Sequence, residues 1–288
     1  MKARSVLFTL FGDVIRPAGG EAWLSTITAC METVGFRPEA VRTALHRMGT
    51  EGWVAPRRQG RYAAYQLTER GAQRLEAAAA RIYRLRSQSW DGRWRLLLAP
   101  TLSGADVVAE LGWIGYGRLQ PGVWAHPHPH PAEARDLIGS CGHQATWLDA
   151  ARSDDDAALA ARAWALADLQ DRHLSFLADW TDAPALAEPP GPAEPPDPAE
   201  AFALRLRLVH DWRKFLFADP GLPAEVLPAD WPGFRAAEAF RNVYEALRIP
   251  SWDFYRGLQQ TAPGSTGEPD EPGADSPFAR GLAALQQS

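Results

Sequence analysis

The chain has 288 residues, of which 46% are hydrophobic, and its formal net charge is −5. This length gives room for about two or three domains, and the apolar content can bury their cores, which excludes a disordered or fibrous chain. The two cysteines, Cys30 and Cys141, have neither metal-ligand nor disulfide-framework spacing, and no apolar stretch approaches the roughly 18 residues of a membrane span. Gly12 and Asp13 interrupt the basic and apolar start of the chain, so we expect no signal peptide and a soluble, cytoplasmic protein.

Charge is distributed unevenly along the chain. Residues 1–88 contain 14 Lys and Arg against 7 Asp and Glu, a net charge of +7, whereas residues 89–288 contain 16 against 28, a net charge of −12. Because like charges repel, this asymmetry predicts that residues 1–88 bind a polyanion that the rest of the chain repels.

The pattern of residues 1–88 predicts one compact module of helices, in which the third helix is followed by a basic hairpin. Gly12 and Asp13 are expected to end the first helix, and Thr68 is the expected N-cap of the last. The predicted elements are helices over 4–12, 21–34, 37–53 and 69–86, with two short strands over 53–67 around the arginine-rich segment 57–61. This order is typical of a winged helix-turn-helix, which is a DNA-binding unit.

The third predicted helix has one apolar and one basic face. Val41, Ala44, Leu45 and Met48 recur at helical spacing and are expected to face a core. The opposite face carries side chains that can reach guanine edges or phosphates. Solvated helix faces have the same residue types, but the net positive charge of residues 1–88 favours DNA. The residues that we assign to DNA are Arg37 at the helix start, Arg42, Thr43, His46 and Arg47 on the helix, and Arg57, Arg58 and Arg61 on the hairpin.

Residues 90–149 predict the order strand, helix, strand, strand, helix, strand, which is that of a ferredoxin-like domain. Pro100 closes the first strand, and Ser103 is the expected N-cap of the first helix. Gln120–Gly122 separates the middle strands, and Pro131 opens the second helix. A long helix is then expected over Asp154–Trp180, because acidic residues in its first turn complement the helix dipole.

The remaining chain is predicted to be helical around a proline-rich segment. Seven prolines in residues 184–198 indicate an extended linker, and helices are expected over 199–217 and 233–248. The fold class is therefore α+β. The expected parts are an N-terminal winged helix-turn-helix domain (1–88), a ferredoxin-like middle domain with a trailing helix (89–182), a Pro-rich linker with a helical C-terminal domain (183–250) and a disordered tail (251–288).

Several segments together make the chain resemble the PaaX family of bacterial repressors, which control phenylacetate-degradation operons. The matching motifs are GD...P.GG.AW at 12–23, VRTALHRM.TEGW at 41–53, YQLTERG at 65–71, WDGRW at 90–94, LGWIGYGRLQPGVWAHP at 111–127, LVHDWRKFLFADPGLP at 208–223 and LPADWPG at 227–233. The resemblance covers about 5–247. It implies the three-part fold above and a homodimer bound to double-stranded operator DNA. It also implies release by an acyl-CoA effector, phenylacetyl-CoA in the best-known members. The proline-rich insert, the acidic tail and the run His126–Pro131 depart from the family pattern.

An aryl acyl-CoA would need an aromatic-lined cavity and cations for its phosphates. Ten of the twelve tryptophans follow residue 88, although tryptophans also simply fill cores. His210 lies on an apolar helix stripe, where a hydrogen-bonded structural histidine is the alternative. We expect the effector site where the middle and C-terminal parts meet, and assign to it Trp94, Trp113, Arg118, His210 and Arg213.

Two further classes of function have to be weighed. A metal-dependent nuclease could be built on a ferredoxin-like domain, but Ala99 and Pro100 stand where such nucleases carry an acidic metal ligand. An effector-free DNA-binding protein would leave the large acidic and aromatic remainder unexplained. His126, His128 and His130 alternate with prolines that hold the chain extended, so we expect no metal site. We accordingly expect no catalytic residues and no cofactor.

Overall fold

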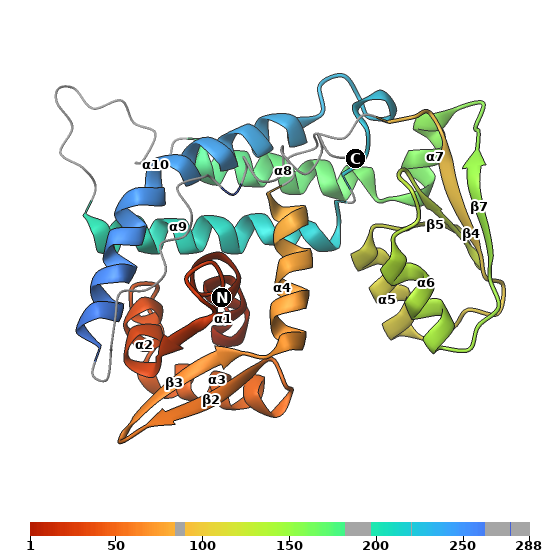
Figure 1. Cartoon of the computed structure of the whole chain (residues 1–288). Coiled ribbons are helices and arrows are strands. Elements are labelled where there is room, and N and C mark those ends of the chain that lie inside the picture. Colours follow the sequence, from red (N-terminus) through yellow and green to blue (C-terminus); the bar gives the residue numbers. More distant parts are fainter. Residues whose placement is uncertain (84–89, 182–196, 220, 263–276, 278–288) are drawn as a thin grey trace. The chain divides into compact units, whose positions relative to one another are not determined.

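The computed structural model describes residues 1–83, 90–181, 197–219, 221–262 and 277 (Figure 1). It is mixed helix and sheet with two antiparallel sheets, so the expected α+β class is confirmed. The chain forms two compact units built from separate segments. Unit 1 is Met1–Arg84, Leu177–Arg213 and Ala237–Ser288, and unit 2 is Leu85–Phe176 and Lys214–Ala236. The expected domain boundaries at 88 and 182 stay predictions.

The N-terminal segment of unit 1 contains helices, a three-stranded sheet and a hairpin. The elements are α1 (Ala3–Leu10), a π-helical turn η1 (Phe11–Ile15), β1 (Glu21–Trp23), α2 (Leu24–Glu32), α3 (Pro38–Thr50), β2 (Val54–Gln59), β3 (Tyr62–Leu67) and α4 (Glu69–Ile82). The sheet order is β1-β3-β2, and all pairs are antiparallel. Thr68 is the N-cap of α4, as predicted, because its Oγ1 accepts from the backbone N–H of Gly71 at 3.1 Å.

Two predictions for this segment were wrong. Gly12 and Asp13 do not end the first helix, which continues as η1 to Ile15 because the side chains around them are buried in the core. Residues 21–23 are not helical either, because Glu21–Trp23 pairs with β3 as an edge strand. In both places tertiary packing overrides the local signal.

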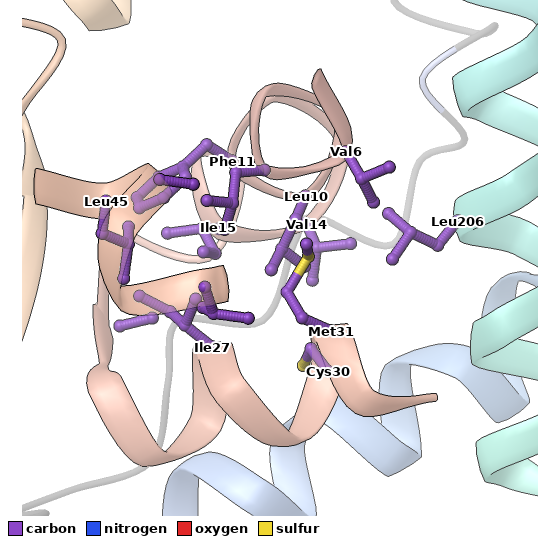
Figure 2. Packing of buried hydrophobic residues seen from close by; sticks show 14 of the residues in the cluster. Val6, Leu10, Phe11, Val14, Ile15, Ile27, Cys30, Met31, Leu45 and Leu206 are labelled. Carbon is purple, nitrogen blue, oxygen red and sulfur yellow. The ribbon is translucent and has the colours of Figure 1, made fainter. Parts of the chain in front are cut away.

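The core of unit 1 joins the N-terminal segment to later helices. Figure 2 shows Val6, Leu10 and Phe11 packing with Ile27 and Leu45 from α2 and α3. Leu206, which lies on α9 (Pro198–Trp212), enters the same cluster beside Val6. Tyr255 from α10 (Pro232–Thr261) is fully buried in it as well. The N-terminal segment therefore shares its core with helices that follow it by about two hundred residues.

The two C-terminal helices end at other residues than predicted. Asp197 caps α9, and the 3-10 turn η3 (Arg213–Phe217) follows it. The helix that was expected to end at Arg248 runs through Pro250 to Thr261, so residues 251–261 are not a disordered tail. A helix-interior proline costs about 3 kcal/mol, and burial of Tyr255 on the far side of Pro250 offsets it. Figure 1 shows that α10 bends along its length.

Unit 2 contains the second sheet, in the element order that the sequence predicted. The elements are β4 (Trp94–Leu98), α5 (Ala105–Ile114), β5 (Gly117–Gln120), β6 (Val123–His126), α6 (Ala132–Ser140) and β7 (Thr146–Ala151). The strand order is β5-β6-β4-β7, and all neighbours are antiparallel. Ser103 is not the N-cap of α5. That position is taken by Gly104 at φ +104°, a backbone conformation that side-chain-bearing residues rarely adopt.

The long helix expected over 154–180 is two helices, α7 (Asp156–Ala163) and α8 (Leu166–Trp180). Trp164 separates them in an extended conformation. Its ring packs against Trp94 with centroids 5.8 Å apart and lies over Gly117, where a Cβ atom would stand 2.5 Å from the ring. This aromatic contact breaks the helix. The 3-10 turn η4 (Ala224–Val226) also belongs to unit 2. In the described part of the chain, no helix has the length and apolar character to cross a membrane.

Candidate DNA interface

Helix α3 presents the two faces that its periodicity predicts. Arg37 is its N-cap and Pro38 its first residue, where a missing N–H costs nothing. The apolar positions are buried, which confirms the predicted core face: Val41, Ala44, Leu45 and Met48. The predicted DNA residues of the helix are all exposed: Arg42, Thr43, His46 and Arg47. The α3 surface therefore offers two arginines and a histidine to solvent on one side.

Thr43 has one hydrogen bond within its own helix. Its Oγ1 donates to the carbonyl of Glu39 at 2.9 Å. The hydroxyl oxygen can still accept a bond and the residue is exposed, so Thr43 can contact a base or a phosphate without leaving this rotamer.

The hairpin differs from the arginine-tipped loop that the sequence predicted. Arg57 and Arg58 lie within β2, paired with Ala64 and Ala63, and only Gly60 and Arg61 form the turn. Successive strand residues point to opposite faces, so Arg57 and Arg58 cannot act together on one surface. A longer ladder than expected explains the difference, because pairing continues to Gln59 and Tyr62.

The three hairpin arginines are held differently. Arg57 forms an ion pair with Glu21 on β1 at 2.5 Å, and hydrogen bonding to Glu21 raises its pKa. Arg61 donates from Nε to the hydroxyl of Tyr62 at 2.9 Å, with its guanidinium over the ring. Arg58 is exposed, and no side chain within the described residues forms an ion pair with it. Arg58 is therefore the hairpin cation most available to a phosphate.

A cluster around Glu51 fixes the end of α3, and sequence reasoning missed it. Arg4 from α1 forms an ion pair with the Glu51 carboxylate, and Trp53 donates to it from Nε1 at 3.0 Å. The Trp53 ring lies edge-on to Phe8 at 5.4 Å and beneath the guanidinium of Arg70 at 4.6 Å. The cluster ties α3 to α1 and α4. A signal existed in the close spacing of Glu51 and Trp53 just after the helix.

A second missed group is a buried network centred on Asp13 in η1. Tyr83 donates to Oδ1 of Asp13, as does Tyr244 at 2.9 Å, while Arg205 donates from Nε to Oδ2 at 2.9 Å. Arg205 Nη2 also donates to the hydroxyl of Tyr244 at 2.8 Å. All four residues lie in unit 1 and are buried. We call these four residues the Asp13 network. A carboxylate within an apolar run was the available signal.

The electrostatics of the Asp13 network follow from burial and one ion pair. Burial raises the pKa of Tyr83 and of Tyr244, since a phenolate is poorly solvated there, and the Asp13 carboxylate raises both further. Burial alone would lower the pKa of Arg205, but the adjacent Asp13 outweighs it and the net shift is upward. The network is therefore an ion pair with two neutral tyrosines at neutral pH.

The predicted effector residues fall in both units. Trp94 is fully buried and donates from Nε1 to Asp156 at 2.6 Å, and the exposed Arg118 lies over the ring of Trp124 at 5.6 Å. Trp113 is buried on α5. These residues belong to unit 2, whereas His210 and Arg213 belong to unit 1. A shared effector site stays a prediction.

His210 and Arg213 form hydrogen bonds with residues of α1. His210 Nδ1 is 3.2 Å from Oγ1 of Thr9, which confirms that His210 is a buried, hydrogen-bonded residue. Arg213 Nη2 donates to the carbonyl and Oγ of Ser5 at 2.8 and 2.6 Å.

The three histidines of the run 126–131 have hydrogen-bond partners, of which Tyr116 lies outside the run. His126 Nδ1 lies 3.1 Å from the backbone nitrogen of His128, and His130 Nδ1 lies 2.5 Å from the hydroxyl of Tyr116. Burial lowers the pKa of His130. Within the described residues, no group of three or more His, Cys, Asp or Glu side chains is arranged to hold a metal ion.

Comparison with known proteins identifies the family of this chain. The family model described as PaaX-like protein matches residues 2–71, and that of the PaaX-like protein C-terminal domain matches residues 164–257. The Transcriptional repressor PaaX of Escherichia coli (strain K12) is 33% identical over 281 residues, which cover 94% of this chain and 87% of that protein. The chain belongs to the PaaX family. Members of the PaaX repressor family are transcription regulators and not enzymes, which removes the nuclease alternative.

A solved structure supports the fold alone. An uncharacterized protein from Mycobacterium tuberculosis superposes with a TM-score of 0.56 at 24% identity, covering 90% of this chain and 99% of that one. This likeness shows a similar fold and is not evidence about function.

Proposed function

We propose that this protein is a DNA-binding repressor of a phenylacetate (aromatic-acid) catabolic operon, released from its operator by an acyl-CoA such as phenylacetyl-CoA. In this proposal the N-terminal segment is a winged helix-turn-helix, the second sheet with α5 and α6 is a ferredoxin-like domain, and the protein acts as a homodimer. Family membership supports the repressor role. The exposed face of Arg42, His46 and Arg47 is the single observation that carries the DNA contact.

Helix α3 is the element that would enter the major groove. Arg42 and Arg47 have the fork geometry that reads guanine O6 and N7, and His46 can donate to the same acceptors. Arg37 stands at the helix N-terminus, where backbone N–H groups and the helix dipole favour a phosphate. Arg58 and Arg61 on the hairpin would contact phosphates or the minor groove. Arg57 is already paired with Glu21 and contributes less.

The release mechanism requires only a modest conformational preference. Two recognition helices of a dimer must match half-sites about 34 Å apart. An effector that favours a dimer with another spacing lowers operator affinity by its differential affinity for the two forms. Tenfold release corresponds to about 1.4 kcal/mol. The residues proposed to bind an aryl acyl-CoA are Arg118, Arg213, Trp94, Trp113 and His210. Of these, Arg118 is exposed and can contact a phosphate without a conformational change.

Selection from genomic DNA tests the DNA-binding part of this proposal. The full chain is incubated with sheared DNA of its own genome, bound fragments are sequenced, and the enriched fragment is footprinted. We expect enrichment of a promoter with two related half-sites. Arg42→Ala should weaken binding to this fragment by about 1–3 kcal/mol and relax its preference at one base position.

Arg207→Ala is the matched control, because Arg207 is exposed on α9 and carries the same charge. It should bind the fragment as the wild type does. Equal recovery of all genomic sequences, or equal binding by Arg42→Ala and wild type, would contradict the assignment of α3.

The alternative of an effector-free DNA-binding protein makes a different prediction. Such a protein binds the same fragment at every acyl-CoA concentration. A change in melting temperature on adding phenylacetyl-CoA separates the two, because only an effector that binds the folded form raises it.

A further inference from the structure

The Asp13 network buries an aspartate within unit 1. Asp13 lies in a π-helical turn, a rare element that is frequent at functional sites, and its side chain is buried. Burying an ion pair gains little stability over well-packed apolar residues, so a network of this kind is better explained by the single geometry that it imposes. Its partners come from three other elements: α9, α10 and the end of α4.

Every strong donor in the network is directed at a defined acceptor. Oδ1 of Asp13 accepts from both tyrosines and Oδ2 accepts from Arg205. The Arg205 guanidinium spans further to the Asp13 carbonyl at 3.3 Å and packs over the Tyr244 ring at 4.7 Å. Apolar surfaces can slide past each other at low cost, whereas these directional bonds are satisfied in one register only.

The network is joined to α3 through two routes. Asp13 continues α1, whose Leu7 and Leu10 share the buried cluster with Leu45 and Met48 of α3. Tyr83 ends α4, the helix that follows the β2–β3 hairpin. A displacement of η1 or of Tyr83 would therefore move both the helix and the hairpin that present the basic residues.

We propose that Asp13, Arg205 and Tyr244 are positioning residues for operator recognition. They fix α9 and α10 against η1, and thereby hold α3 and the hairpin in the orientation that specific DNA contacts require. This inference rests on the proposed DNA-binding function. It predicts that loosening the network reduces specific binding while leaving the basic side chains themselves in place. Non-specific binding depends on charge alone and is spared.

The test compares two tyrosines of α10 that differ in their hydroxyl contacts. Tyr244 and Tyr255 are both buried, but the Tyr255 hydroxyl has no hydrogen-bond partner among the described residues. Tyr244→Phe and Tyr255→Phe therefore make the same chemical change with and without loss of the network. Both are measured as full chains by fluorescence anisotropy. The DNA is the fragment recovered from the genomic selection and a scrambled fragment, at a temperature where circular dichroism shows each variant folded.

Tyr244→Phe is expected to weaken binding to the selected fragment by about 3- to 10-fold and to leave binding to the scrambled fragment unchanged. Tyr255→Phe should match the wild type on both. If Tyr244→Phe does not fold, Tyr83→Phe removes the other hydroxyl from Oδ1 and is expected to act in the same direction.

The inference is overturned if the folded network variant binds both fragments as the wild type does, even with a lower melting temperature, because the network would then serve stability alone. A parallel loss on both fragments also overturns it, since orientation affects specific contacts selectively. Wild-type protein that binds no DNA removes the proposed function and this inference together, and is recognised before any variant is compared.

Discussion

Arg205 donates from Nε to Oδ2 of Asp13 at 2.9 Å, across a separation of 192 residues in the chain. The bond joins α9 to the π-helical turn that follows α1, so the N-terminal segment of unit 1 is packed and hydrogen-bonded to a helix far along the chain. Its core includes Leu206 and Tyr255, and its buried carboxylate is neutralised from α9. If this segment contacts DNA as proposed, changes in α9 and α10 would reach it through these direct contacts.

Removal of one member of this ion pair is expected to be costly. Arg205→Met leaves the Asp13 carboxylate buried without its cation and should lower the free energy of unfolding by about 3–5 kcal/mol. Urea-induced unfolding of the full chain, followed by circular dichroism, measures the change. Arg207→Met on the exposed side of the same helix is the control and should change it by less than about 0.5 kcal/mol. Similar small losses for both variants would mean that the pair contributes no more than a surface charge.

Alkaline pH should destabilise the protein through its buried tyrosines. Burial, with the added charge of Asp13, raises the pKa of Tyr83 and Tyr244 above the value of about 10 that an unfolded chain has. Above about pH 10 the unfolded state loses protons that the folded state keeps, so stability present below this pH is lost as the pH rises. Each such tyrosine adds a slope of about 1.4 kcal/mol per pH unit.

The free energy of unfolding measured from about pH 9 to 11 checks this prediction. The free energy of unfolding of Tyr83→Phe should decrease less steeply with pH than that of the wild type over this range, although the variant is less stable at the start. Parallel slopes in the two proteins would show that Tyr83 ionises equally easily in both states.

Arg57 and Arg58 are adjacent but should differ in their contribution to DNA binding. Each phosphate contact adds about one unit to the slope of log affinity against log salt concentration. Arg58→Ala should therefore lower this slope by about one unit and weaken binding to every sequence alike. Arg57→Ala should change it less, since Arg57 is paired with Glu21. Anisotropy titrations at several salt concentrations measure both. A larger slope change for Arg57→Ala would reverse the assignment.

Gly71→Ala should destabilise the protein although Ala is the better helix former. A Cβ atom at Gly71 would stand 2.3 Å from the carbonyl oxygen of Trp53, a backbone atom just before β2. Such overpacking costs about 1–3 kcal/mol, which exceeds the gain of about 1 kcal/mol from helix propensity. Gly139→Ala on α6 meets no atom within 4 Å and should instead stabilise slightly. Thermal unfolding of both variants measures these changes. A melting temperature of Gly71→Ala above that of the wild type would contradict the close packing of Gly71 against Trp53.

Short-range sequence patterns predicted the faces of α3, the N-cap of α4 and the element order of unit 2. The buried and exposed sides of α3 follow from residues at helical spacing, and Thr68 as N-cap follows from its position before the helix. The order of strands and helices in unit 2 also follows from short segments bounded by glycine and proline.

Features that depend on distant partners were not predictable in this way. Asp13 looked like a helix end because no local pattern reveals Arg205 or Tyr244. The last helix was expected to end at Arg248 because the packing of Tyr255 beyond that point is tertiary. Trp164 divides a helix that its alanine-rich sequence favours, since its ring is placed by Trp94. In each case a long-range contact outweighs a local preference of about 1–3 kcal/mol.

The most direct test of the account is release of the selected operator fragment by acyl-CoA. Labelled fragment is bound to the full chain at fixed salt and titrated with phenylacetyl-CoA, other acyl-CoAs, free phenylacetate and CoA, with anisotropy as the readout. A repressor of the proposed kind loses operator affinity by about tenfold or more with phenylacetyl-CoA and is unaffected by free phenylacetate. An operator affinity that is the same in the presence of every acyl-CoA would contradict it.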